Sequence, residues 1–373
     1  MCRPSRHDRS NGSRRDGGAA SQSNGTRQGV KKLRIGIVGL GMAVTPHARG
    51  LADLGDSIEV AYAFSPSAER RASFAARFPF PTTDRLETIL DDRSVGAVLI
   101  LSPANTHADI TKRCAAAGKH VLLEKPIDIT TARAEEAVSA CRAAGVTLGI
   151  VLQHRFRPAG MALAEQLRSG AMGELVGCST VIRLWRPQTY YDEPGRGSFA
   201  RDGGGVVLIS QGIHTLDLML SLAGPIVEVA GHAITSSVHR METEDTVAAA
   251  VRFANGAIGT IDATTAAYPG FPERIELISR NATAALAGTA LEIFWHDGRR
   301  TRVEPDRSAG GTGADPMAFP HDYHRAVMAD FADAIRTGRE PKVTGEEALK
   351  VHRLIDALIA AGKAPGRVQV ATG

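Results

Sequence analysis

Short apolar runs alternate with amphipathic stretches between residues 33 and 153. The apolar runs predict strands over residues 33–38, 58–64, 95–101, 120–123 and 147–152. The intervening stretches predict helices over residues 46–54, 68–78, 106–117 and 131–144. Strands separated by helices at this spacing are typical of a parallel sheet with crossover helices. The pattern therefore predicts a parallel α/β domain over residues 33–153.

The second half of the chain has a different pattern. After a predicted helix at residues 158–169, longer strands of alternating apolar and polar residues are expected at 175–186, 226–236, 246–254, 257–265, 274–279 and 290–295. Such alternation is typical of an antiparallel sheet with one covered face. Further helices are expected at residues 203–223, 319–337 and 345–361. We therefore predict a second α/β domain over residues 154–373, whose last helix packs back on the first domain.

The positive charge of the 373-residue chain is concentrated at one end. The net charge is +4, but residues 1–32 hold eight Lys and Arg against two Asp, so the remainder is slightly negative. This segment is rich in Ser, Gly and Asn and poor in apolar residues, which predicts a disordered basic tail. The folded part therefore gives no indication of a nucleic-acid surface.

The four cysteines show no C-x-x-C spacing, which favours reduced thiols and a cytoplasmic location. No apolar run approaches the ~20 residues that a membrane helix needs. The histidines are scattered along the chain without the spacing of a ligand cluster. We therefore expect no membrane partner and no metal site.

A glycine turn follows the first predicted strand. Gly39 and Gly41 precede Met42 and Ala43 at the start of the predicted helix, which is the context of a dinucleotide-binding turn. The first glycine permits a tight turn, and the second allows backbone amides to approach a pyrophosphate at the helix N-terminus. Val44 occupies the third position, where glycine or alanine is usual. We predict an NAD or NADP site at this turn.

The end of the second strand bears on the choice of coenzyme. No acidic residue stands where NAD enzymes usually bind the ribose hydroxyls, whereas Ser65 and Arg70 follow this strand. A serine with an arginine can hold a 2′-phosphate through charge-assisted hydrogen bonds, which gives a slight lean to NADP. The alternative is that Ser67 caps a helix whose arginines are solvated.

Lys125 stands in Glu124-Lys125-Pro126, directly after the strand predicted at residues 120–123. The carboxyl end of that strand should face the coenzyme crevice. A lysine there can bond a substrate oxygen, stabilise developing charge and relay a proton, while Glu124 orients it or bonds nearby amides. The alternative is an exposed turn that ends the strand.

Four motifs together give the chain a family resemblance over residues 33–371. They are Gly39-Leu40-Gly41 with His47, the run from Ser102-Pro103 to His107, the run from Gly118 to Glu124-Lys125-Pro126, and three glycines at 203–205 leading to His214 and Asp217. The chain resembles the glucose-fructose oxidoreductase / inositol dehydrogenase / MocA family. The resemblance implies an N-terminal Rossmann domain, a C-terminal domain with an open antiparallel sheet, sugar or polyol substrates and a homodimer or homotetramer. It also implies a cis Lys125-Pro126 bond.

His214 lies on the helix predicted at residues 203–223, in a polar stripe with Ser210, Asp217 and Ser221. The resemblance implies that this histidine is the acid/base group for the reacting hydroxyl, and its ordinary pKa suits that exchange. Dehydrogenating members often carry aspartate four residues earlier, where this chain has Ser210. Lys125 and His214 then carry the proton chemistry alone, or Asp217 orients the imidazole. The alternative is a structural histidine.

Further candidates lie close to these residues in the predicted fold. Ser102, Pro103, Asn105 and His107 end a strand and are expected to contact the nicotinamide ribose. The resemblance places substrate or coenzyme contacts at His154 and Arg155, and we predict that both contact the substrate. Trp185, Arg186 and Tyr191 belong to an aromatic and cationic segment that suits a sugar ring and an acidic or phosphorylated group. The alternative for that segment is a dimer contact or surface packing.

These observations predict an NAD(P)-dependent dehydrogenase or reductase that transfers a hydride between the nicotinamide and a sugar, polyol or related cyclic alcohol or ketone. An NAD-dependent lyase or glycosidase on the same fold is the first alternative. A non-catalytic, coenzyme-binding sensor is the second.

Overall fold

The computed structural model describes residues 32–203, 206–306, 320–363 and 366–371, so nearly all of the predicted basic tail lies outside it. Its first sheet is parallel and has the order β3-β2-β1-β4-β5-β6. The strands are β1 (Leu33–Val38), β2 (Ile58–Phe64), β3 (Thr82–Thr83), β4 (Ala97–Ile100), β5 (His120–Glu124) and β6 (Leu148–Val151). This doubly wound order confirms the predicted Rossmann sheet, and it reverses direction between β1 and β4, the switch point at which such sheets bind ligands.

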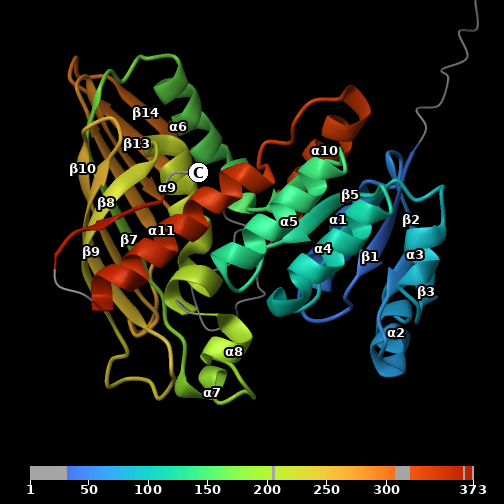
Figure 1. The fold of residues 1–373 in the computed structure, drawn as a ribbon. Coiled ribbons are helices and arrows are strands. Elements are labelled where there is room, and N and C mark those ends of the chain that lie inside the picture. The colour runs from blue at the N-terminus through green and yellow to red at the C-terminus, as the bar shows by residue number, and fades with distance from the viewer. Residues whose placement is uncertain (1–31, 204–205, 307–319, 364–365, 372–373) are drawn as a thin grey trace, which may run out of the picture. The chain divides into compact units, whose positions relative to one another are not determined.

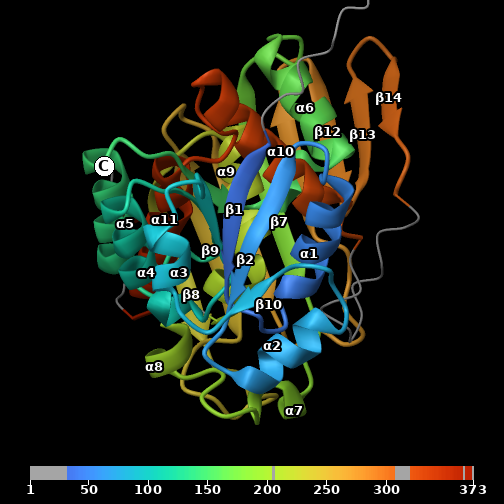
Figure 2. The same cartoon turned by 90° about the vertical axis from the view of Figure 1, so that its right-hand side faces the viewer.

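Helices lie on both faces of this sheet. They are α1 (Val44–Asp53), α2 (Ala68–Ala75), α3 (Glu87–Asp91), α4 (His107–Ala116) and α5 (Thr131–Ala143). Figure 2 shows α1 on one side of β1 and β2, with α3, α4 and α5 on the other. The central strands are buried on both sides, since every residue of β4 and β6 is buried. That burial explains their continuous apolar runs.

The second sheet has nine strands in the order β14-β13-β12-β11-β7-β10-β9-β8-β15. Its strands are β7 (Leu175–Arg183), β8 (Ile226–Ile234), β9 (Thr246–Phe253), β10 (Ile258–Thr264), β11 (Arg274–Ser279), β12 (Ala282–Ala287), β13 (Ala290–Trp295), β14 (Arg300–Val303) and β15 (Val368–Gln369). Only the β10–β7 pair among them is parallel. The predicted, mainly antiparallel sheet is thus confirmed, although the pattern did not reveal β12 or β14.

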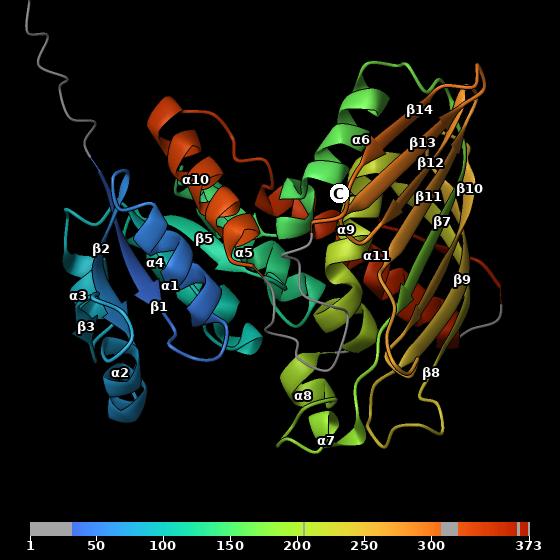
Figure 3. The same ribbon diagram turned by 180° about the vertical axis from the view of Figure 1, so that it is seen from behind.

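Helices cover one face of this second sheet. Figure 3 shows α6 (Pro158–Arg168) and α9 (Ile213–Ala223) on the same side of the strands. In β9 buried residues alternate with exposed ones, as a sheet with one covered face requires. The other face exposes Val176, Ile258, Ile278 and Phe294.

The helix predicted over residues 203–223 has a more complex form. A short helix, α8 (Phe199–Asp202), precedes a π-helical segment at Val206–Gly212, after which α9 begins at Ile213. Among the described residues, the span from Phe199 to Ala223 is the one stretch long and apolar enough to cross a membrane, but most of its apolar window is buried inside the protein. Burial of that kind is also found in core helices, so this span is weak evidence for a membrane segment.

The two C-terminal helices contact the Rossmann sheet and its helices. In α10 (Asp322–Thr337), Val327, Met328 and Phe331 belong to the same buried cluster as the residues of β1 and α1. The longer α11 (Gly345–Lys363) contacts both α5 and β8 (Figure 1). The chain therefore returns from the second sheet to the first through these two helices.

Candidate active site

Lys125 stands one residue beyond β5 and reaches the segment that precedes α9. The Lys125-Pro126 peptide bond is cis. Lys125 Nζ donates a hydrogen bond of 2.8 Å to the backbone oxygen of Ser210 in the π-helical segment. Burial lowers the pKa of Lys125, Glu124 opposes that change, and Arg186 adds to it. A lysine in this setting gives up its proton more readily than an exposed lysine.

Glu124, the residue before Lys125, makes two hydrogen bonds. Its Oε1 lies 2.8 Å from His47 Nε2, and its Oε2 accepts a hydrogen bond from the Lys125 backbone amide. Burial alone would raise the pKa of Glu124, but the hydrogen bond from His47 and the neighbouring positive groups bring it down to about 2. Glu124 is therefore a carboxylate at neutral pH and provides the negative charge beside Lys125.

His47, Glu124 and His324 are the one group of three potential metal ligands found among the described residues. The rings of His47 and His324 meet edge to face, with centroids 4.9 Å apart. Burial is the main cause that lowers the pKa of His324 to about 3. The hydrogen bond between His47 and Glu124 accounts for that pair without an ion.

His214, on the first turn of α9, packs against another histidine. Its ring stacks on that of His154 with centroids 4.8 Å apart. Burial, followed by the charge of Lys125, lowers the pKa of His214 well below 6.5. In the described part of the chain, Nδ1 of His214 is buried and has no hydrogen-bond partner. His214 is thus a neutral imidazole, and the nearby charge of Lys125 disfavours its protonation.

Asp217 does not orient the imidazole of His214. Both of its oxygens accept hydrogen bonds from Arg155, at 2.8 Å from Nε and 2.6 Å from Nη2. Arg155 is also paired with Glu347 on α11. Arg155, predicted as a substrate contact, therefore ties α9 to α11.

The glycine turn leaves room for a phosphate group. Gly39 has φ +103°, and a Cβ there would lie 2.7 Å from backbone atoms of Leu101 and Ser102. A Cβ on Gly41 would meet no atom within 4 Å. Met42 is 67% exposed, and no side chain caps α1 in the described structure. Free backbone donors at a helix N-terminus with open space in front suit a dinucleotide pyrophosphate.

The predicted coenzyme contacts that follow β4 differ in their exposure. Ser102 is half-buried, whereas Pro103 and Asn105 are exposed. Ser102 Oγ lies 2.8 Å from Thr106 Oγ1. His107 is 1% exposed, with each ring nitrogen 2.8 Å from a backbone carbonyl oxygen. That geometry favours an internal bridge for His107 over the predicted contact with the coenzyme.

A 2′-phosphate site is predicted after β2, but the structure there supports the alternative, in which Ser67 caps a helix. Ser67 Oγ accepts from the Arg70 backbone amide and caps α2. Ser65 is 2% exposed and accepts from the Ser67 amide. Arg71, rather than Arg70, folds onto this turn and donates to the Ser65 carbonyl oxygen. The structure thus gives no shared pocket to Ser65 and the exposed Arg70 side chain.

The aromatic segment after β7 presents Tyr190, rather than Tyr191, to the site. The predicted contact Tyr191 is 4% exposed, and its hydroxyl lies 2.7 Å from Thr265 Oγ1. Gln211, which was not predicted as a site residue, accepts from Arg186 and donates to the Tyr190 hydroxyl. Trp185 is half-buried and packs edge-on against Tyr268.

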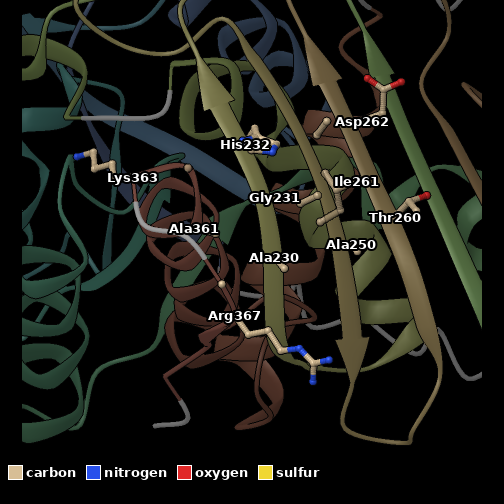
Figure 4. Close-up of a pocket in the computed structure, with 14 residues that line it drawn as sticks. Ala230, Gly231, His232, Ala250, Thr260, Ile261, Asp262, Ala361, Lys363 and Arg367 are labelled. Carbon is tan, nitrogen blue, oxygen red and sulfur yellow. The ribbon is translucent and has the colours of Figure 1, made fainter.

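A large depression lies away from these residues. It encloses about 900 Å³ at the β8 edge of the second sheet and is lined by residues of β8, β9 and β10 and by the end of α11 (Figure 4). Small residues such as Ala230, Gly231 and Ala250 form much of its wall. None of the predicted site residues lines it, so this depression is not the candidate active site.

Two family profiles match the chain. The profile described as "Oxidoreductase family, NAD-binding Rossmann fold" matches residues 33–151, and that of the "GFO/IDH/MocA C-terminal domain" matches residues 161–285.

Curated relatives and solved structures agree with these matches. Myo-inositol 2-dehydrogenase of Thermotoga maritima is 28% identical over 84% of this chain and 92% of its own length. The scyllo-inositol 2-dehydrogenase (NAD(+)) of Bacillus subtilis is 26% identical over 85% of this chain and 90% of its own. The WlbA dehydrogenase of Bordetella pertussis, solved with NADH and UDP-GlcNAcA, is 26% identical with a TM-score of 0.78, over 92% of this chain and 100% of its own. The chain belongs to the GFO/IDH/MocA family of oxidoreductases.

Proposed function

We propose that this protein is a dehydrogenase or reductase that uses NAD(H) to interconvert a CH–OH group and a carbonyl on a sugar, a polyol or a related cyclic alcohol. The observation that carries the proposal is the hydrogen bond from Lys125 Nζ to the Ser210 oxygen. It brings the ammonium group to the segment that leads into His214, four residues further along the chain. An acid/base pair beside a coenzyme crevice is what alcohol oxidation requires.

Lys125 and His214 have distinct roles in the proposed oxidation. Lys125 donates a hydrogen bond to the substrate oxygen and stabilises negative charge as it develops there. Neutral His214 accepts the hydroxyl proton at the ring nitrogen that carries no proton. A coenzyme held by the Gly39–Ala43 turn would supply the hydride acceptor for the carbon that bears this hydroxyl. In the reverse direction His214 returns the proton to the alkoxide oxygen.

The coenzyme assignment follows the relatives and the β2 turn. The names of two relatives quoted above contain NAD(+) or NADH. Ser67 caps α2 and Arg70 is exposed. Ser65 and Arg70 therefore do not form the 2′-phosphate pocket on which the slight preference for NADP was based. NAD(H) is therefore the proposed coenzyme, held by the Gly39–Ala43 turn with Ser102, Pro103 and Asn105 beside the nicotinamide ribose.

The substrate proposal rests on relatives named for inositols and on the segment after β7. Trp185 and Tyr190, both half-buried, offer aromatic surface there, and the buried Arg186 lies close enough to Lys125 for its charge to lower the pKa of that lysine. Exposed apolar side chains on the open sheet face, including Ile258 and Phe294, support a homo-oligomer. The direct test is an absorbance screen of sugars, inositols and uronic acids with NAD⁺ and NADP⁺. Steady reduction with one substrate class is expected, whereas a co-purifying coenzyme that is never consumed would favour the lyase alternative.

Substitution of the two turn glycines tests the coenzyme site. Gly39→Ala places a side chain at φ +103° and against the β4 backbone, so we expect the free energy of unfolding to fall by roughly 1–3 kcal/mol. Gly41→Ala meets open space, so stability should change by less than about 0.5 kcal/mol. Its methyl group would lie where the pyrophosphate binds, and the NADH Kd should rise about tenfold or more. Urea unfolding and NADH titration measure both, and wild-type NADH affinity in Gly41→Ala would contradict this placement.

Lys125→Met keeps the length of the side chain and removes its charge. We expect kcat on the identified substrate to fall about 10²- to 10⁴-fold because the substrate oxygen loses its donor. The NADH Kd should change little. Lys112, a partly exposed lysine on α4 paired with Glu136, provides the matched control Lys112→Met. Wild-type turnover in Lys125→Met would exclude the proposed role.

The pH dependence of kcat/KM tests the protonation states proposed for His214 and Lys125. His214 must be unprotonated to accept the proton, and burial lowers its pKa well below 6.5, so kcat/KM should fall on the acid side only below pH 6.5. Lys125 must be protonated, and burial lowers its pKa below 10.5, so activity should be lost as pH rises through a value under 10.5. An acid limb above pH 6.5 that disappears in His214→Asn would contradict the neutral-base assignment.

A further inference from the structure

Two buried histidines contact the peptide groups that follow Lys125. His107, at the start of α4, places Nδ1 2.8 Å from the Pro126 carbonyl oxygen. His352, on α11, places Nε2 3.2 Å from the Ile127 backbone amide, which donates to it. The two histidines are 1% and 2% exposed. They therefore bind neighbouring atoms of one loop from two different helices.

The hydrogen bond from the Ile127 amide to His352 determines that Nε2 of this ring carries no proton. A backbone amide can only donate, so Nε2 of His352 must present a lone pair. A protonated Nε2 would place two N–H groups against each other. Burial lowers the pKa of His352 to about 4, while Asp128 opposes that change. His352 is thus a neutral acceptor.

The contacts of His107 require the opposite state. Its Nε2 lies 2.8 Å from the Ser102 carbonyl oxygen, so both ring nitrogens face carbonyl oxygens. Carbonyl oxygens only accept, and a neutral imidazole has only one N–H. In either neutral tautomer a lone pair would face an oxygen at 2.8 Å inside the protein, leaving a buried acceptor unsatisfied. The imidazolium satisfies both contacts.

Carboxylates near His107 offset part of the cost of burying a charge. Burial lowers the pKa of His107 below its usual value of 6.5, and the two carbonyl contacts, Glu124 and Asp128 reduce that shift. Asp128 is fully buried and accepts from the amide of Ala108, the next residue after His107. It also accepts from Arg133 Nε at 3.0 Å. Burial alone favours the neutral ring, but the two carbonyl contacts leave no acceptor role for either nitrogen, and only the imidazolium satisfies both of them.

We propose that His107 and His352 are positioning residues that hold the Lys125 loop from two sides, His107 as an imidazolium that joins Pro126 to Ser102 and His352 as a neutral acceptor for Ile127. Through Ser102 the clamp also sets the end of β4, where the coenzyme is proposed to bind, relative to the lysine. Its effect on turnover rests on the proposed function, whereas the two protonation states do not.

The protonation states can be measured on the full-length chain without a substrate. Nitrogen-15 NMR of histidine-labelled protein at pH 7, with His107→Gln and His352→Gln for assignment, reports each ring nitrogen separately. We expect both nitrogens of His107 to carry protons and Nε2 of His352 to carry none. A neutral tautomer at His107, or a protonated Nε2 at His352, would overturn the clamp.

Enzyme kinetics test whether His107 and His352 position Lys125. His107→Phe keeps the ring and removes both donors, and His352→Leu removes the acceptor. Each should lower kcat on the order of tenfold to a hundredfold by misplacing Lys125, while the KM for NADH stays within about twofold. His107→Asn retains a donor near the Nδ1 position, and His352→Gln retains an acceptor, so each should recover part of the loss.

His296 is exposed, and His296→Gln is the matched control. If His107→Phe or His352→Leu does not fold, the Asn and Gln variants give the same comparison in weaker form. Unchanged kcat, or a loss of NADH affinity equal to the loss of kcat, would overturn the positioning role. If wild-type protein reduces neither coenzyme with any substrate tested, the proposed function fails while the NMR result still decides the clamp.

Discussion

The candidate site depends on one hydrogen bond, from Lys125 Nζ to the backbone oxygen of Ser210. This bond connects the end of β5 in the parallel sheet to the segment leading into α9. An ammonium group withdrawn from water needs strong acceptors and a nearby negative charge. The Ser210 oxygen provides the first and Glu124, itself held by His47, provides the second. The lysine is therefore fixed by residues from β5, α1 and the π-helical segment together.

The rest of the site is arranged around a limited amount of negative charge. Glu124 is held ionised with a pKa of about 2, and Asp217 is occupied by Arg155. The imidazoles of His154 and His214 have pKa values lowered chiefly by burial, with Lys125 and Arg157 acting in the same direction. Neutral imidazoles beside a buried cation avoid adding like charge. The base role proposed for His214 therefore does not depend on a carboxylate at the position of Ser210.

The sequence was a good guide where side-chain periodicity determines the structure. Alternating burial in β9 and the unbroken apolar run of β4 each follow from the faces they cover. The π-helical segment could not be predicted, because a π turn and an α turn have the same composition. The alanine-rich β12 was missed since alanine does not favour strands. His107 and Tyr191 were placed at the surface of the site, yet their partners lie 19 and 74 residues away along the chain. Such long-range bonds leave no local signal.

The most direct test of the account is a crystal structure of the protein with NADH and the substrate found by screening. We expect the nicotinamide ring to lie between the Gly39–Ala43 turn and α9, with Lys125 Nζ and a ring nitrogen of His214 both within hydrogen-bond distance of one substrate oxygen. A nicotinamide bound elsewhere, or a substrate oxygen that contacts neither side chain, would contradict the central claim.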